Sequence, residues 1–207
     1  KFFDVVTWTG DSSEDQTISH NLNSSVGLII TKKTNASGHW TTFHISKGNG
    51  GYGSLNANDQ FGTGAQWGVT NTTFNADGGL ANNATGDTYV AYLFADNTGE
   101  DAEDQMIKCG SYTGAGANLN INLGWEPQFV MIKCTSHTTN WVMFDTMRGL
   151  PVDGNAKDLK PNLSDSEGDN SAIGITSTGF LARNGVDGQI NGNGKSYIYM
   201  AIRAPMM

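Results

Sequence analysis

An ordered series of short motifs occurs twice in the sequence, and this repetition constrains the fold more than any other feature. The first half contains, in order, Thr7-Trp8-Thr9-Gly10, Leu28-Ile29-Ile30-Thr31-Lys32, Trp40-Thr41-Thr42-Phe43 and Gly86-Asp87-Thr88-Tyr89. The second half contains Gly110-Ser111-Tyr112-Thr113-Gly114, Phe129-Val130-Met131-Ile132-Lys133, Trp141-Val142-Met143-Phe144 and Gly194-Lys195-Ser196-Tyr197. The order is kept and the offset is nearly constant, which predicts two homologous modules at residues 1–97 and 106–207, joined by an acidic linker at 98–105.

The apolar segments within each module are typical of β-strands. They are short, rich in β-branched and aromatic residues, and bounded by Gly, Asn, Asp and Ser, while helix-period apolar stripes of useful length are missing. Residues 89–95 and 197–202 are apolar at both alternating sets of positions, as expected for central strands. Half-apolar sheets must each bury one face. The expected fold is therefore all-β, with two tandem antiparallel β-sandwich modules of jelly-roll-like form.

Strand phase gives a set of residues that we expect to be mostly buried. They are Leu28, Ile30, Phe43, Val90, Tyr92, Phe129, Met131, Phe144 and Ile198. Trp40 and Trp141 occupy equivalent places in the two halves, which favours a role in the core or at its edge. The two cysteines, Cys109 and Cys134, lack zinc-site spacing, and we expect buried free thiols, with a single bridge as the alternative.

Composition excludes several classes of function. The chain has 12 Lys and Arg against 20 Asp and Glu, a net charge of −8, which disfavours diffuse binding to nucleic acid or anionic membranes. The longest apolar runs, such as 27–30 and 129–132, are far shorter than the roughly 18 residues that span a bilayer. The chain opens on Lys1 without an initiator Met, so we expect it to be part of a longer protein.

The repeated motifs resemble duplicated modules of bacteriophage virion proteins. The resemblance is carried by Trp-Thr-Gly or Tyr-Thr-Gly, Ile-x-His-x-Leu or Ile-x-Leu-Gly, the apolar strand before Lys32 or Lys133, Trp-x-x-Phe-His or Phe-Asp-x-x-Arg-Gly, and Gly-Asp-Thr-Tyr-Val-Ala-Tyr. It covers Val6 to Pro205. Such modules occur mostly in marine and cyanobacterial phages, often as tail fibre or structural proteins. The resemblance implies a virion component, without saying whether it is a tip, a shaft or a capsid ornament.

Metal sites and cofactors are not expected. His39 and His44 fall on opposite faces of a strand, and His20 and His137 stand apart from them in the sequence. The acidic stretches 11–15, 100–104 and 165–169 lack the spacing of an EF-hand loop, so solvated loop charge is favoured over loose Ca²⁺ binding.

Enzymatic activity is not expected either. There is no nucleophile elbow or phosphate-binding loop followed by a helix pattern, and Gly48-Asn49-Gly50-Gly51-Tyr52-Gly53 is interpreted as a surface loop. Nothing marks a buried acid pair of the kind that glycosidases use, although the sequence alone does not exclude one.

Two aromatic residues, Tyr52 and Trp67, are the candidates for contact with a ligand or another subunit. Both lie in the glycine-rich region 48–70, whereas the corresponding region 149–172 contains no aromatic residue. A ring there can stack on a sugar or bury itself at a subunit contact.

These inferences predict a non-enzymatic structural or adhesive module of a phage tail fibre or other host-attachment appendage. The expected partners are other virion proteins, further copies of the chain in a homotrimer, and a glycan or protein receptor on the host. A capsid decoration or head fibre is the first alternative. A virion polysaccharide-degrading enzyme and a secreted lectin-like adhesin are less favoured.

Overall fold

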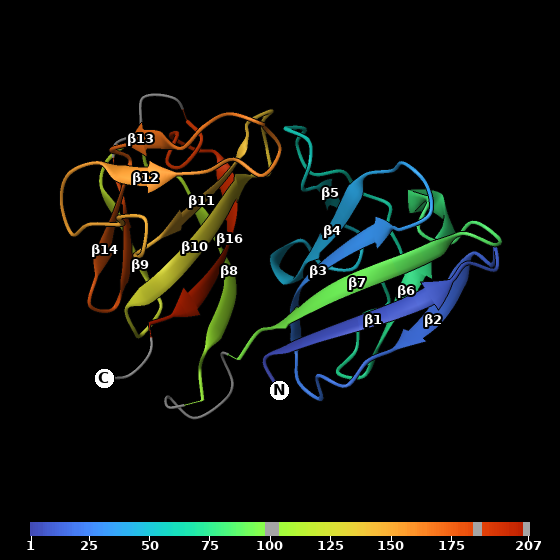
Figure 1. Cartoon of the computed structure of the whole chain (residues 1–207). Helices are drawn as coiled ribbons and strands as arrows, with labels where there is room; N and C mark the ends of the chain where they lie inside the picture. Colours follow the sequence, from blue (N-terminus) through green and yellow to red (C-terminus); the bar gives the residue numbers. More distant parts are fainter. Residues whose placement is uncertain (98–103, 184–187, 205–207) are drawn as a thin grey trace. The chain divides into compact units, whose positions relative to one another are not determined.

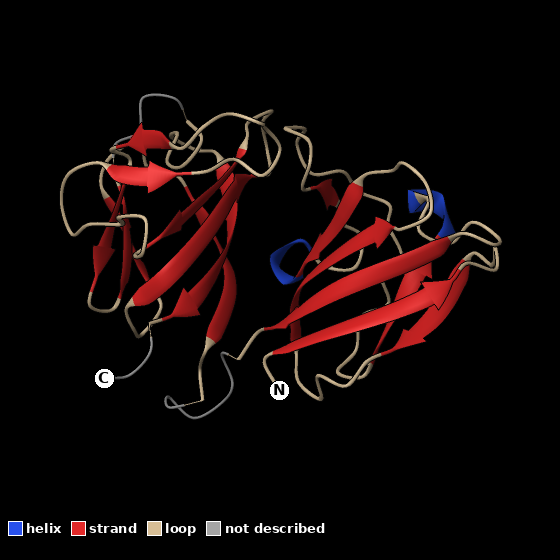
Figure 2. Ribbon diagram, in the orientation of Figure 1, coloured by secondary structure: helices blue, strands red, loops and turns tan. Residues whose placement is uncertain are grey.

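The computed structural model describes residues 1–97, 104–183 and 188–204 and is all-β, with antiparallel strand pairing (Figures 1 and 2). The helical elements among these residues are two 3-10 turns, η1 (Ile45–Lys47) and η2 (Gly78–Leu80). Within the described part of the chain, no helix has the length and apolar character needed to cross a membrane. The expected fold class is confirmed.

The chain divides into two compact units. The first comprises Lys1–Asn56 and Phe61–Gly99, and the second comprises Ala57–Gln60 and Glu100–Met207. These ranges lie near the predicted module boundaries, except that the short segment Ala57–Gln60 belongs to the second unit. Of the predicted linker at 98–105, residues 98–103 lie outside the described residues.

The first unit has a large and a small sheet. The large sheet has the order β1–β7–β3–β4–β5, and the small sheet pairs β2 with β6. The strands are β1 (Phe3–Thr9), β2 (Asp15–Ser19), β3 (Val26–Lys33), β4 (Trp40–His44), β5 (Gly53–Ser54), β6 (Thr73–Asp77) and β7 (Thr88–Ala95).

The second unit has three sheets, with the orders β8–β16–β10–β11, β9–β15–β14 and β12–β13. Its strands are β8 (Ile107–Thr113), β9 (Leu119–Asn122), β10 (Pro127–Cys134), β11 (Trp141–Asp145), β12 (Ala156–Asp158), β13 (Gly168–Asn170), β14 (Ile173–Thr176), β15 (Gly179–Ala182) and β16 (Ser196–Arg203).

The large sheets of the two units share one strand order and one register. β1, β7, β3 and β4 correspond to β8, β16, β10 and β11. Lys33 pairs with Tyr89 as Cys134 pairs with Tyr197, and both ladders carry an irregularity at the start of the long strand, at Val26/Leu28 and Pro127/Phe129. Trp40 and Trp141 occupy the same register position, as do Phe43 and Phe144. A duplication predicts this correspondence, and the common origin of the units remains a hypothesis.

The repeated Trp/Tyr-Thr-Gly motif has the same physical role in each unit. Trp8 stacks on Tyr89 with ring centroids 5.2 Å apart, and Tyr112 stacks on Tyr197 at 4.9 Å. Gly10 and Gly114 lie against the carbonyl oxygens of Ala84 and Gly192, so a β-carbon at either position would collide with the backbone. The motif thus joins an aromatic core residue to a close crossing of two loops.

Each unit encloses its own hydrophobic core between its sheets. In the first unit, Trp8, Phe43, Phe74, Tyr89 and Leu93 are buried in one cluster. In the second, the buried cluster includes Tyr197, Phe144, Phe180, Ile132 and Val142. Residues from both the large and the small sheet contribute to each cluster, which is the arrangement of a β-sandwich.

Six of the nine residues expected in the interior are buried, and three are only half-buried. The buried ones are Leu28, Ile30, Phe43, Met131, Phe144 and Ile198. Val90, Tyr92 and Phe129 are intermediate in exposure. On β7 the core face is formed by Tyr89, Ala91, Leu93 and Ala95, so Val90 and Tyr92 point to the other face of the sheet. Cys109 and Cys134 are buried and unbridged, as expected.

Candidate functional site

Trp67 belongs to the core of the first unit. Its side chain is completely buried, its ring lies 5.8 Å from that of Phe43, and its Nε1 donates to the Gly51 carbonyl at 3.0 Å. The Gly51 carbonyl comes from the glycine-rich loop, which therefore covers Trp67 instead of presenting it at the surface. This placement corrects the expectation that Trp67 offers a ring to a ligand or another subunit.

Tyr52, the other candidate, is half-buried at the edge of a cavity. Its backbone pairs with Gly62 in both directions, N to O at 3.2 Å and O to N at 2.8 Å. The Tyr52 ring lies so close to Gly62 that a β-carbon there would collide with it. The glycine therefore lets the ring lie flat against the neighbouring strand segment, and its orientation is fixed by that contact.

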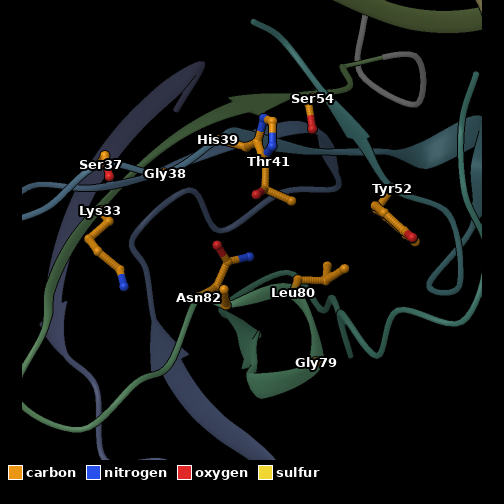
Figure 3. Close-up of a pocket in the computed structure, with 11 residues that line it drawn as sticks. Lys33, Ser37, Gly38, His39, Thr41, Tyr52, Ser54, Gly79, Leu80 and Asn82 are labelled. Atoms are coloured by element: carbon orange, nitrogen blue, oxygen red, sulfur yellow. The ribbon is translucent and has the colours of Figure 1, made fainter. Parts of the chain in front are cut away.

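The cavity beside Tyr52 has a volume of about 320 Å³ and belongs wholly to the first unit. It is bordered by the end of β3, the β3–β4 turn, β4, β5 and η2 with the residues after it. Figure 3 shows Lys33 at one end and Tyr52 at the other, with Thr41 directed toward Leu80 and Asn82 on the opposite side. His39 and Ser54 lie along its upper edge in this view.

Lys33 is held by an ion pair at the end of the cavity. Its Nζ lies 2.5 Å from Asp87 Oδ2 and 5.7 Å from the centre of the Tyr89 ring. The hydrogen bond to Asp87 raises the pKa of Lys33 above its usual value. The positive charge is therefore already matched by a carboxylate that does not line the cavity.

Asn82 contributes a buried polar side chain that is only partly satisfied. The residue is 4% exposed. Its backbone oxygen accepts from Trp8 Nε1 at 3.1 Å, and its Oδ1 accepts from Thr31 Oγ1 at 3.2 Å. Its Nδ2 is buried without a hydrogen-bond partner and is directed toward the cavity in Figure 3. A buried donor of this kind costs about 1–3 kcal/mol, which a ligand oxygen would offset.

The second unit is apolar at the corresponding positions. By register, Thr31 and Thr41 correspond to Ile132 and Val142, and Lys33 corresponds to Cys134. Asn82 corresponds to Ile190, because Tyr112 Oη donates to the Ile190 carbonyl as Trp8 Nε1 does to that of Asn82. These four residues of the second unit are buried, and all four belong to its hydrophobic core.

Polar residues thus replace core residues at one end of the first sandwich. The sequence reasoning singled out Tyr52 but not Asn82, Thr41 or Lys33. A usable signal was present in the repeat alignment, where threonines face the interior on two strands whose counterparts carry Ile and Val.

The four histidines do not gather. His20 and His44 are buried, and each accepts through Nδ1 from a backbone N–H two residues ahead, at Leu22 and Ser46. Burial lowers the pKa of His20. His39 borders the cavity, and His137 is exposed. No cluster of three or more metal-ligating side chains occurs among the described residues.

The acidic stretches are occupied by local contacts where they are described. Asp11 accepts hydrogen bonds from Ser13 N and from Asn83 Nδ2. At 165–169, Asp169 pairs with Lys157 at 2.7 Å. In the remaining acidic stretch, 100–104, residues 100–103 lie outside the described residues.

Comparison with known proteins places the chain in one family. A model described as a domain of unknown function, DUF7483, matches residues 2–204. No curated protein and no solved structure matches. Because the match covers nearly the whole sequence, the chain belongs to the DUF7483 family.

Proposed function

We propose that this protein is a non-catalytic attachment module of a bacteriophage virion, carried on a tail fibre or a related appendage. The motif resemblance supports a virion role, and the two sandwich units suit a protein that presents loops and cavities from a rigid frame. The observation that carries the attachment role is the cavity at the end of the first sandwich, bordered by Tyr52 and by polar side chains.

The chemistry of the cavity favours binding over hydrolysis. A glycosidase places two carboxyl groups about 5–9.5 Å apart across its cleft. Within the described part of the chain, the residues that line this cavity include Lys33, His39, Tyr52 and Asn82 but no Asp or Glu. Asp87, which pairs with Lys33, is not among the lining residues. Donors and an aromatic ring are thus available for recognition, whereas an acid pair is not.

A homotrimer remains part of the proposal, on a different basis from Trp67. β1 is an edge strand of the large sheet of its unit. Near its start, Phe2, Phe3 and Val5 are 40–46% exposed. Unpaired strand edges with apolar side chains are stabilised when another chain covers them. Mass photometry of the full-length protein tests this part, and a monomer at micromolar concentration would contradict it.

The experiment that tests the virion role is localisation on purified particles. Antibodies against this chain, carried on gold, are applied to particles of the phage that encodes it. Labelling of tail appendages is the expected result. Labelling of the head would favour the capsid decoration instead. Absence of the chain from the particles, established by mass spectrometry, would overturn the proposal.

A further inference from the structure

We propose that the cavity of the first unit binds one ring of a neutral saccharide. This inference rests on the proposed attachment function and names the ligand class for that same site.

The size fits a small ligand. At about 320 Å³ the cavity lies at the lower end of the range of roughly 300–1,000 Å³ found for small-molecule sites. A peptide segment or an extended chain would exceed it. A single sugar ring, with its neighbours in the glycan directed toward solvent, suits both the volume and the open form of the site.

The walls divide into an apolar and a polar part. Tyr52 and Leu80 lie toward one end in Figure 3, while Thr41, Asn82 and Lys33 occupy the middle and the other end. A pyranose ring has the same division, with C–H groups on its faces and hydroxyl groups around its edge. The Tyr52 ring can cover a face, and the polar side chains can bond the edge.

Asn82 supplies the most specific feature. Its Oδ1 lies 3.2 Å from Thr31 Oγ1, and its buried Nδ2 has no hydrogen-bond partner. A sugar hydroxyl is both donor and acceptor, so one hydroxyl can accept from Asn82 Nδ2 while donating to another oxygen of the site.

Charge selects a neutral ligand. Among the described residues, Lys33 is the only Lys or Arg that lines the cavity, and its charge is matched by the ion pair with Asp87. A cationic ligand would find no carboxylate on the lining. We therefore expect acidic sugars to bind more weakly than neutral ones.

The second unit provides an internal contrast. Where the first unit has Thr31, Thr41 and Asn82, the second has Ile132, Val142 and Ile190, all buried in its core. Polar side chains that face the interior lower stability unless they are hydrogen-bonded. Thr41 and Asn82 line the cavity, and Thr31 contacts Asn82. This grouping of polar residues, in one of two units with the same strand order, points to a ligand site.

The test is saturation-transfer difference NMR and calorimetry on the full chain. The probes are methyl glycosides of glucose, galactose, mannose and N-acetylglucosamine, with N-acetylneuraminic acid as the acidic probe. Binding of at least one neutral glycoside is expected, and Tyr52→Ala should weaken it by about tenfold or more. Thr41→Val should weaken it by about fivefold, the effect of one hydrogen bond.

Tyr92→Ala is the matched control. Tyr92 is a half-buried ring of the same unit that stacks with Trp40 and does not line the cavity. This variant should bind like the wild type, and circular dichroism checks that all variants are folded.

Three results would overturn the inference: no neutral glycoside binds at millimolar concentration, Tyr52→Ala binds as tightly as wild type, or the acidic sugar binds best. Adsorption to host cells separates this failure from failure of the attachment role. If the wild type and Tyr52→Ala both adsorb equally, the attachment function stands and this site does not mediate it.

Discussion

The two units build the same framework around different interiors. In both, an asparagine fastens the loop after the first strand. Asn83 accepts from Asp11 N and donates to the Ser13 carbonyl, and Asn191 accepts from Ala115 N and donates to the Ala117 carbonyl. A Tyr hydroxyl, from Tyr89 or Tyr197, then accepts a backbone N–H on the opposite loop.

The difference lies one residue before each of these asparagines. Asn82 brings a polar side chain toward Thr31, whereas Ile190 is completely buried among apolar residues. The first unit therefore has polar side chains and a cavity where the second unit has apolar core packing. The framework is therefore set by a few aromatic, Gly and Asn positions, while the interior at that end differs between the units.

Removing a buried ring from each unit tests whether the two units share one framework, and it should cause the largest loss of stability. Phe43→Ala and Phe144→Ala remove equivalent buried rings, and each should lower the free energy of unfolding by about 3–5 kcal/mol. Urea unfolding with hydrogen exchange resolved by peptide measures each unit separately. Met147→Ala, at a residue that is 94% exposed, is the control. A loss below about 1 kcal/mol at one Phe but not at the other would show that the two positions are not equivalent.

Placing polar residues of the first unit into the second unit tests whether the two interiors can be exchanged. Ile132→Thr places a hydroxyl in the core of the second unit, opposite Ile190 rather than an amide, and should destabilise it by about 2–4 kcal/mol. Adding Ile190→Asn restores the partner that Thr31 has in the first unit. The double variant should then lose less than the sum of the single variants. Strict additivity would indicate that the Thr31–Asn82 pair depends on its local surroundings.

The same positions show how much of the fold could be predicted from the sequence. The recurring motifs predicted corresponding strands because Trp, Phe and Tyr lie at fixed places in each register. The phase of β7 was not predictable, because Val90 and Tyr92 are as apolar as the core residues Ala91 and Leu93. Only tertiary packing decides between two apolar faces.

The candidate site was predicted in part. Tyr52 was singled out as a ring without a counterpart, and it borders the cavity. Trp67 shared that signal, but its ring is buried beside Phe43 and bonded to the Gly51 carbonyl, and no local pattern encodes these contacts. Asn82 follows a 3-10 turn and contacts Thr31, which lies far from it in the sequence. The place of Asn82 in the site could therefore be found only from the fold.

Lys32 and Lys133 occupy the same register position in the two units. We expect Lys133 to make the stability of the second unit depend on pH. Lys133 is 1% exposed, its Nζ donates to the carbonyls of Cys134 and Thr139, and burial lowers its pKa to about 8. The unfolded chain binds the proton more tightly, with a pKa of about 10.4. Between these values the unfolded state holds more protons, so stability rises with pH.

The expected gain in the second unit is of the order of 1–3 kcal/mol between about pH 8 and 10.5. Hydrogen exchange at fixed pH values, corrected for intrinsic rates, measures it. Lys133→Met should remove this part of the pH dependence, while Lys32→Met, at the corresponding half-buried position, is the control. An unchanged slope in Lys133→Met would contradict the assignment to Lys133.

We expect the smallest change in stability for a substitution in the lining of the cavity. Thr41→Val gives the first unit the residue that the second unit has at the same register position, Val142. The contact that Thr41 makes with Thr31 uses its backbone oxygen, at 3.3 Å from Thr31 Oγ1, and is kept in the variant. The free energy of unfolding should change by no more than about 0.5 kcal/mol, because the lost hydroxyl borders a cavity rather than a packed core. A loss above about 2 kcal/mol in urea unfolding would mean that the hydroxyl is a structural element of the first unit, and the polar lining would then need no ligand to account for it.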